Sequence, residues 1–175
     1  KTLVQINENS RLKVSGNDLS VLNTINDAFL CMRNGIISDF GKMEDNKING
    51  ILIENPHIMI IDATGKFVFP SFCDSHTHLV YAGSREIEYG DKIRGLSYEE
   101  IAKRGGGILN SARLLHETSE DELYNQSMVR VNEIISLGTG AVEIKSGYGL
   151  NVDDELKMLR VIRRIKNTSP IEVKS

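Results

Sequence analysis

The amino-acid sequence predicts an α/β protein, and three observations lead to this fold class. From residue 67 onwards, strand-like and helix-like segments alternate, which is typical of a parallel sheet. Residues 1–66 hold only short strand candidates between polar loops, and they predict a separate β-rich domain. The α/β domain, 67–175, contains two strand–helix units and the start of a third. Because a parallel sheet must be covered on both faces or closed into a barrel, we expect this chain to be the front part of something larger.

Composition excludes several classes of function. The chain has 175 residues and a net charge of -3, with 40% hydrophobic and 26% charged residues, and this is ordinary for a soluble domain. It has no basic patch, so a nucleic-acid partner is not expected. No apolar run approaches the ~20 residues that span a membrane. Cys31 and Cys73 lie in different segments and form no disulfide framework, so we expect a reducing, cytoplasmic location.

The clearest element of the β-rich domain is a hairpin around Asn34-Gly35. Apolar residues flank this pair on both sides, at 28–32 and 36–41, and this pattern is a strong hairpin signal. Residues 7–23 are polar and predict a loop with room for one strand. The other strand candidates are three short apolar runs, at 3–6, 51–53 and 58–61. His57 precedes the last of them and is interpreted as an ordinary surface histidine.

The α/β domain carries clear helix signals after a loop that extends to about Leu96. Ser97 with Glu100, and Ser119 with Glu122, have the spacing of capping boxes at helix starts. Helices are expected at 97–103, 108–116, 119–138 and 153–166, and strands at 141–146 and 171–174. Glycines 105–107 are interpreted as a hinge or as an anion-binding loop, with the hinge favoured. His116 is expected to be a solvated side chain.

The most informative residues are His76, Thr77 and His78. An apolar run from Phe67 to Phe72 leads into them and predicts a buried strand. Residues two apart in a strand point to the same face, so the two imidazoles could hold one metal ion. Asp74 lies on that face and could orient a histidine. The alternative is a pair of polar residues where a strand meets a loop.

Four segments together resemble the imidazolonepropionase family of the metal-dependent amidohydrolase superfamily. They are F-C-D-S-H-T-H-L-V-Y-A-G-S-R-E (72–86), G-G-G-I (105–108), V-E-I-K-S-G-Y-G-L (142–150) and E-L-K-M-L-R-V-I (155–162). The H-x-H pair alone indicates the superfamily, whereas A-G-S-R-E and K-S-G-Y-G-L are specific to the family. Ser71 departs from the glycine that usually follows proline in the superfamily. The resemblance covers residues 60–175 well and the β-rich start loosely.

The resemblance implies a fold and a set of site residues. The fold would be an amidohydrolase-type (β/α)8 barrel, of which this chain holds the first two to three β/α units, preceded by part of a small β-sandwich. His76 and His78 would bind one divalent or trivalent metal ion per subunit, zinc or iron. Arg85 and Tyr148 would bind the substrate. The remaining ligands and the acid/base residues would lie beyond Ser175.

Each of these residues also has a plainer interpretation. Arg85 could form a surface ion pair with Glu86 or Glu88, and Tyr148 could be an aromatic side chain packed at a turn. Lys145 corresponds to no known carboxylated lysine, because that residue occurs on a later strand of the superfamily fold, so a single metal ion is expected.

The activity that the resemblance implies is hydrolysis of the cyclic amide 4-imidazolone-5-propanoate to N-formimino-L-glutamate, in histidine degradation. It implies a small-molecule substrate and allows a homodimer. The alternatives are another cyclic-amide hydrolase or an aminohydrolase of the same superfamily, or a non-catalytic binding or assembly module. We expect residues 1–175 alone to be inactive, because two imidazoles are too few ligands for a catalytic metal site.

Overall fold

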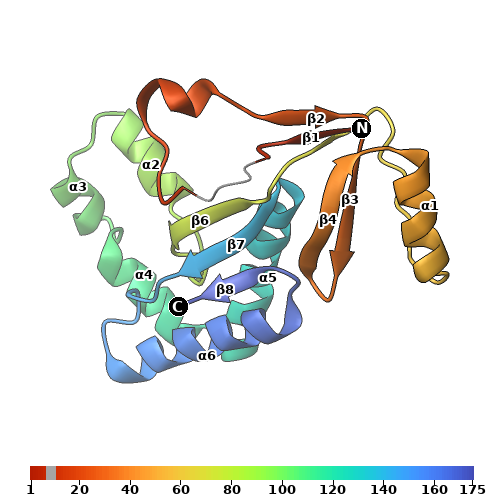
Figure 1. Cartoon of the computed structure of the whole chain (residues 1–175). Coiled ribbons are helices and arrows are strands. Elements are labelled where there is room, and N and C mark those ends of the chain that lie inside the picture. The colour runs from red at the N-terminus through yellow and green to blue at the C-terminus, as the bar shows by residue number, and fades with distance from the viewer. Residues whose placement is uncertain (7–10) are drawn as a thin grey trace. The chain divides into compact units, whose positions relative to one another are not determined.

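The computed structural model describes residues 1–6 and 11–175, which form two separate units, 1–70 and 71–175 (Figure 1). Together they make a mixed α/β protein with small sheets, and no closed barrel is present among the described residues. The assignment of the two units to a β-sandwich and a barrel stays a prediction. Within the described ranges, no helix has the length and apolar character needed to cross a membrane.

The first unit contains a three-stranded sheet with the order β2-β1-β5. Strand β1 (Thr2–Val4) pairs antiparallel with β2 (Thr24–Asn26) and parallel with β5 (Phe67–Val68). The strand expected at 3–6 is therefore present but shorter. The loop expected over 7–23 includes residues 7–10, which lie outside the described residues, and a 3-10 helix, η1, spans Gly16–Ser20.

The predicted Asn-Gly hairpin is confirmed. Strands β3 (Ala28–Arg33) and β4 (Ile36–Lys42) pair antiparallel, with a bulge between Cys31 and Met32. Asn34 and Gly35 have φ angles of 54° and 77°, as a two-residue turn of the favoured hand requires.

Two strand predictions in this unit are wrong. The run 51–53 lies in helix α1 (Asp45–Glu54), and the run 58–61 forms no strand. Ile48, Ile51 and Leu52 follow helical rather than alternating spacing, and three apolar residues are too few to distinguish the two periods. Ile60 and Ile61 are largely exposed and pair with no described strand.

The second unit is built on a parallel sheet with the order β6-β7-β8. Its strands are β6 (Phe72–Thr77), β7 (Thr139–Ile144) and β8 (Glu172–Lys174). The expected strand–helix alternation is therefore confirmed here. However, the strand that carries the histidine pair is an exposed edge strand in this chain rather than the buried strand expected, since residues 72–76 are all exposed.

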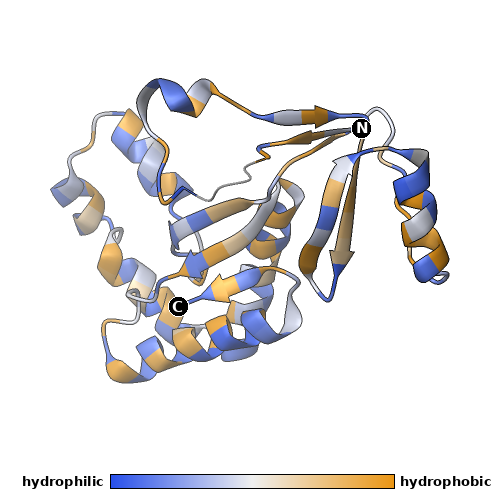
Figure 2. Cartoon of the chain, in the orientation of Figure 1, coloured by the Kyte–Doolittle hydropathy of each residue, from blue (hydrophilic) through white to orange (hydrophobic). Residues whose placement is uncertain are grey.

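Helices α5 (Glu120–Ser136) and α6 (Val152–Thr168) pack against this sheet (Figure 1). Both helices alternate hydrophobic and hydrophilic bands (Figure 2), as expected for helices that cover a sheet on one side. Side chains from the sheet, from these helices and from neighbouring segments form one buried core, which includes Val80, Leu115, Leu123, Val131, Val142, Ile144, Met158, Ile162, Ile165 and Val173.

Three shorter helices connect β6 to α5. Helix α3 (Tyr98–Lys103) begins with the predicted capping box, and α4 (Ile108–Glu117) follows the glycines as expected. Helix α2 (Glu86–Ile93) corrects the loop expected up to Leu96. It buries no residue and contains Gly90, so its sequence lacks the apolar stripe by which a helix is recognised.

Core burial on α6 gives a direct test of this packing. Ile165→Ala should lower the free energy of unfolding by about 2–5 kcal/mol, because Ile165 is 0% exposed and its loss leaves a cavity. Leu159→Ala, on the same helix but 42% exposed, should cost less than half as much. Urea unfolding followed by circular dichroism measures both values, and equal losses would contradict the described core.

Candidate functional site

The two histidines of the H-x-H motif lie together at the end of β6. His76 is in the strand and is exposed, and His78 follows one residue after its end and is half-buried. Their ring centroids are 5.4 Å apart, with an angle of 69° between the ring planes. The predicted juxtaposition of the two imidazoles is therefore present in the structure.

The position of this pair depends on how β6 ends against β7. The Lys145 N–H donates to the Thr77 carbonyl at 2.8 Å, and the Thr77 hydroxyl donates to the Glu143 carbonyl at 2.9 Å. Thr77 is thus held on both its main chain and its side chain. Because strand side chains alternate, fixing Thr77 also fixes the face on which its two histidine neighbours lie.

Arg130 of α5 holds the chain immediately after the histidines. Its guanidinium donates to the carbonyls of Leu79 and Tyr81 at 2.8 and 2.7 Å, and it lies over the Tyr81 ring at 3.8 Å. Burial lowers the pKa of this guanidinium from its ordinary value. The sequence analysis missed Arg130, since nothing in a helix sequence shows which arginine will reach a neighbouring loop.

Asp74 does not take the role expected for it. Its carboxylate accepts a hydrogen bond from the main-chain N–H of His76 at 3.1 Å, rather than from an imidazole. A carboxylate two residues before an N–H commonly closes such a local turn. Asp74 therefore shapes the backbone that carries His76.

Tyr148 is the second predicted site residue that the fold brings to the histidines. Its ring centroid is 5.1 Å from that of His78. The preceding Gly147 has a φ of 125°, and a Cβ atom there would lie 3.9 Å from Cε1 of His78. Tyr148 also packs partly against the core, so its plainer interpretation as a packed aromatic side chain holds as well.

The Nδ1 atom of His78 is buried, and it has no hydrogen-bond partner among the described residues. A buried ring nitrogen is normally paired, because an unpaired one costs about 1–3 kcal/mol. A metal ion would satisfy such an atom, and neutral imidazole is a common metal ligand. Within the described ranges, the surroundings of this histidine pair included, no group of three or more His, Cys, Asp and Glu side chains is placed to hold a metal ion.

Arg85 forms the ion pair that was its alternative interpretation. Its Nε donates to Glu88 Oε2 at 3.0 Å, and Glu88 Oε1 accepts the Gly107 N–H at 2.9 Å. Gly106 packs so closely that an added Cβ would lie 2.8 Å from Ile101 Cγ2. The glycine loop therefore packs at Gly106 and binds a carboxylate of its own chain through Gly107, and its interpretation as a hinge stays a prediction.

Lys145 forms an ion pair with Glu143, with 2.5 Å between Nζ and Oε1. Glu143 lies on the face of β7 opposite to the buried Val142 and Ile144, and Lys145 follows the end of the strand. The charge of the lysine is therefore balanced by a carboxylate two residues earlier in the chain.

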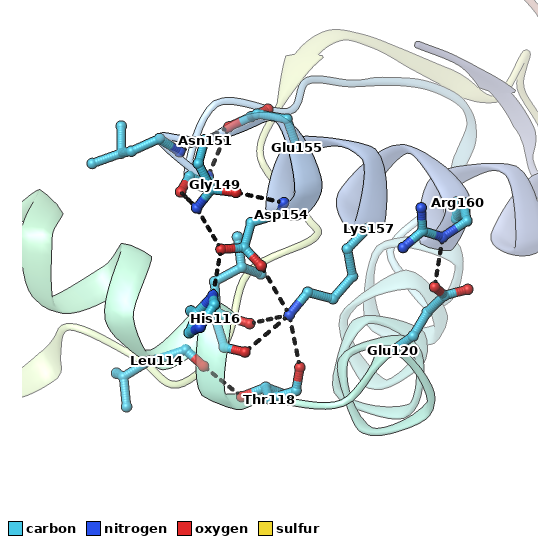
Figure 3. Close-up of polar contacts among 12 residues, drawn as sticks. Leu114, His116, Thr118, Glu120, Gly149, Asn151, Asp154, Glu155, Lys157 and Arg160 are labelled. Atoms are coloured by element: carbon cyan, nitrogen blue, oxygen red, sulfur yellow. Dashed lines mark hydrogen bonds and ion pairs between the residues drawn. The ribbon is translucent and has the colours of Figure 1, made fainter.

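A polar network lies at the start of α6, next to the loop that carries Tyr148 (Figure 3). Asp154 is 3% exposed, and its carboxylate accepts hydrogen bonds from Asn151 at 2.7 Å and from His116 Nδ1 at 2.9 Å. Lys157 lies 3.2 Å from it and also donates to the carbonyls of Leu115, His116 and Thr118, at the C-terminal end of α4. His116 is solvated, as predicted, but it also takes part in this network.

The hydrogen bond from Asn151, joined by those from His116 and Lys157, lowers the pKa of Asp154 to about 2. Sequence reasoning missed this residue, because Asp153 and Asp154 look alike at a helix start. Only the packing of α6 against α4 shows that one is buried and the other is not.

Comparison with known proteins gives the same family as the sequence motifs. The chain is 54% identical over 173 residues to the imidazolonepropionase of Flavobacterium johnsoniae, and 55% identical over 175 residues to that of Flavobacterium psychrophilum. It is 43% identical over 149 residues to the imidazolonepropionase of Pyrobaculum arsenaticum. These matches cover 99%, 100% and 85% of the chain, but 41%, 41% and 36% of the respective relatives. No protein-family model matches the chain.

The fold and the site together define the class, an α/β protein with a histidine pair at the end of a parallel strand. Within that class, the chain is a homologue of the imidazolonepropionases along its whole length. It corresponds to an N-terminal portion that spans about 41% of these relatives.

Acid should weaken the network at the start of α6. The pKa of Asp154 is lower in the folded chain than its ordinary value of 3.8, so its stabilising effect is complete above that value and is lost as the pH falls towards about 2. We expect the free energy of unfolding to decrease over this interval. Asp154→Asn should cost roughly 3 kcal/mol near neutral pH and flatten the acid dependence.

Equilibrium unfolding measured between pH 5 and pH 2 provides the test. Asp153→Asn is the matched control, because Asp153 is exposed and adjacent on the same helix. If the two variants responded to acid alike, Asp154 would not be the group responsible.

Proposed function

We propose that this chain contributes part of the active site of a metal-dependent imidazolonepropionase, which hydrolyses 4-imidazolone-5-propanoate to N-formimino-L-glutamate. The observation that carries the proposal is that His76, His78 and Tyr148 meet after two adjacent parallel strands, β6 and β7. Active sites of barrels built from parallel strands lie at that end of the strands. Identity of 54–55% to proteins named imidazolonepropionase supports the choice of substrate.

His76 and His78 would supply two ligands to one zinc or iron ion. The unpartnered, buried Nδ1 of His78 and the 5.4 Å separation of the two rings fit this role. When bound, such an ion polarises the substrate carbonyl and lowers the pKa of water to roughly 7. The further ligands and the acid/base residues belong, in this proposal, to the part of the relatives that the chain does not span.

Arg85 would bind the propionate of the substrate. Its Nε is used by Glu88, which leaves the two Nη groups of a planar guanidinium for a second carboxylate. The side chain is 43% exposed and so remains accessible. A carboxylate already bound on one edge reduces the freedom of the guanidinium before the substrate arrives.

Tyr148 would contact the ring of the substrate or the formimino group of the product. Its ring lies against that of His78, and its hydroxyl forms no hydrogen bond with any other described residue. Two flanking glycines allow the backbone at this position to come close to a ligand.

Removal of a histidine tests the metal site. In a full-length protein that contains residues 1–175, His76→Ala and His78→Ala should each abolish ring opening and reduce bound metal from about one ion per subunit to well below that. Metal is measured by mass spectrometry, and turnover by loss of the ultraviolet absorbance of the substrate. His57→Ala is the control, because His57 lies in the first unit. Full metal content and activity in both variants would exclude this site.

Substitution of Arg85 tests carboxylate recognition. Arg85→Lys keeps the positive charge but loses bidentate geometry, so KM for the substrate should rise about 10-fold, and Arg85→Ala should raise it further. Metal content should not change. Arg113→Lys, an exposed arginine on α4 that pairs with Glu117, is the control. An unchanged KM in both Arg85 variants would mean that Arg85 forms its ion pair with Glu88 but does not bind the substrate.

A further inference from the structure

The loop between β7 and α6 has an unusual backbone. It runs through residues 145–151 and carries Tyr148 at its centre. Gly147 has a φ of 125°, and Leu150 has a φ of 57°, in the left-handed region that residues with a side chain seldom adopt. Such a conformation persists only where surrounding contacts determine it.

Glu155, in the first turn of α6, supplies those contacts (Figure 3). Its Oε1 atom accepts the Gly149 N–H at 2.7 Å and lies 3.4 Å from the Leu150 nitrogen, which also donates to it. Partial burial raises the pKa of Glu155, but the polar groups around its carboxylate, among them the Gly149 and Leu150 amides that bond to it, outweigh this effect and lower the pKa below its ordinary value. The loop therefore wraps around one ionised carboxylate.

Close packing fixes the same loop from the other side. Gly149 is buried, and a Cβ atom there would lie 2.6 Å from the Glu155 nitrogen and 2.8 Å from the Asp154 carbonyl carbon. The backbone at Gly149 thus lies directly on the first turn of α6. Because both its amide and its α-carbon are held, the loop cannot shift without breaking the bonds to Glu155.

These contacts bear on the site because Tyr148 lies between the two constrained glycines. Its ring lies 5.1 Å from that of His78, and no described hydrogen bond holds the Tyr148 side chain itself. The direction of the ring is therefore set by its packing against the core and by the backbone of residues 147–149, and that backbone is held by Glu155.

We propose that Glu155 is a positioning residue for the active site. Its carboxylate binds the Gly149 and Leu150 amides of the 145–151 loop and so holds Tyr148 against His78 for substrate binding. The role in substrate binding rests on the proposed function, whereas the positioning of the loop does not.

A general stabilising effect on the start of α6 would be a simpler role for a carboxylate. Acidic residues near a helix N-terminus stabilise it through the helix dipole. However, the cap of α6 is Asn151, whose side chain accepts the Asp154 N–H at 2.9 Å. Asp153 is also acidic and lies nearer the helix start, but it is exposed. Asp153 therefore provides the matched control, because it has the helix-dipole effect but no hydrogen bond to the loop.

The first experiment measures the loop in residues 1–175. Glu155→Ala should speed amide hydrogen exchange at Gly149 and Leu150 by at least about tenfold, and it should shift the His78 ring resonances as Tyr148 moves. Glu155→Gln keeps an acceptor oxygen of the same size, so it should restore part of the protection. Asp153→Asn should leave both signals unchanged. If Glu155→Ala does not fold, the comparison of Glu155→Gln with Asp153→Asn replaces it as the test. Loss of the negative charge in Glu155→Gln should still speed amide exchange at Gly149 relative to Asp153→Asn.

The second experiment measures catalysis in a full-length protein that contains this segment. Glu155→Ala should lower kcat/KM by about 10- to 100-fold without loss of bound metal. Tyr148→Phe alone should also lower kcat/KM. In the double variant the fold-loss of kcat/KM should be smaller than the product of the two single fold-losses, because both changes act on one contact.

The outcomes separate the two proposals. Unchanged exchange at Gly149 and Leu150 in a folded Glu155→Ala variant would overturn the positioning role. Altered exchange with full activity in both Glu155→Ala and Tyr148→Phe would overturn the proposed function of Tyr148 and leave the positioning of the loop intact. Fully multiplicative effects in the double variant would show that Glu155 acts on catalysis by another route.

Discussion

The site depends on the parallel pairing of β6 with β7, and above all on the bond from the Lys145 N–H to the Thr77 carbonyl. Thr77 and Lys145 are 68 positions apart in the chain, yet this pairing makes the ends of the two strands neighbours. His78 follows one end and Tyr148 the other, so their rings meet. Helices α5 and α6 maintain the pairing by burying the apolar side of the sheet.

Two glycine-rich turns of the second unit share one design, in which a carboxylate of the same unit binds an amide of the turn. Glu88 accepts the Gly107 N–H and also pairs with Arg85, and Glu155 accepts the Gly149 N–H beside Tyr148. Glycine permits the close approach, and the carboxylate selects one loop conformation among the many that glycine allows. A proposed substrate contact thus lies next to each carboxylate: Arg85 pairs with Glu88 directly, and Tyr148 is held through the backbone that Glu155 binds.

Sequence reasoning succeeded where a local signal determines the structure and failed where packing does. The Asn34-Gly35 turn and the Ser97 capping box are local, and both were predicted. The run 51–53 became part of α1, because three apolar residues satisfy either period. Helix α2 escaped prediction since it buries nothing, and Glu155 escaped because an acidic residue in the first turn of a helix looks like any solvated one.

By itself, the sequence determined the order of strands and helices in the second unit apart from α2, the H-x-H pair and the motifs shared with imidazolonepropionases, because period, caps and motifs are properties of consecutive residues. Only the tertiary structure decided that His78 lies against Tyr148, that Arg85 shares a carboxylate with a glycine loop, and that Asp154 is buried whereas Asp153 is not. These facts depend on contacts between segments far apart in the chain, and no local pattern encodes which side chain will meet which.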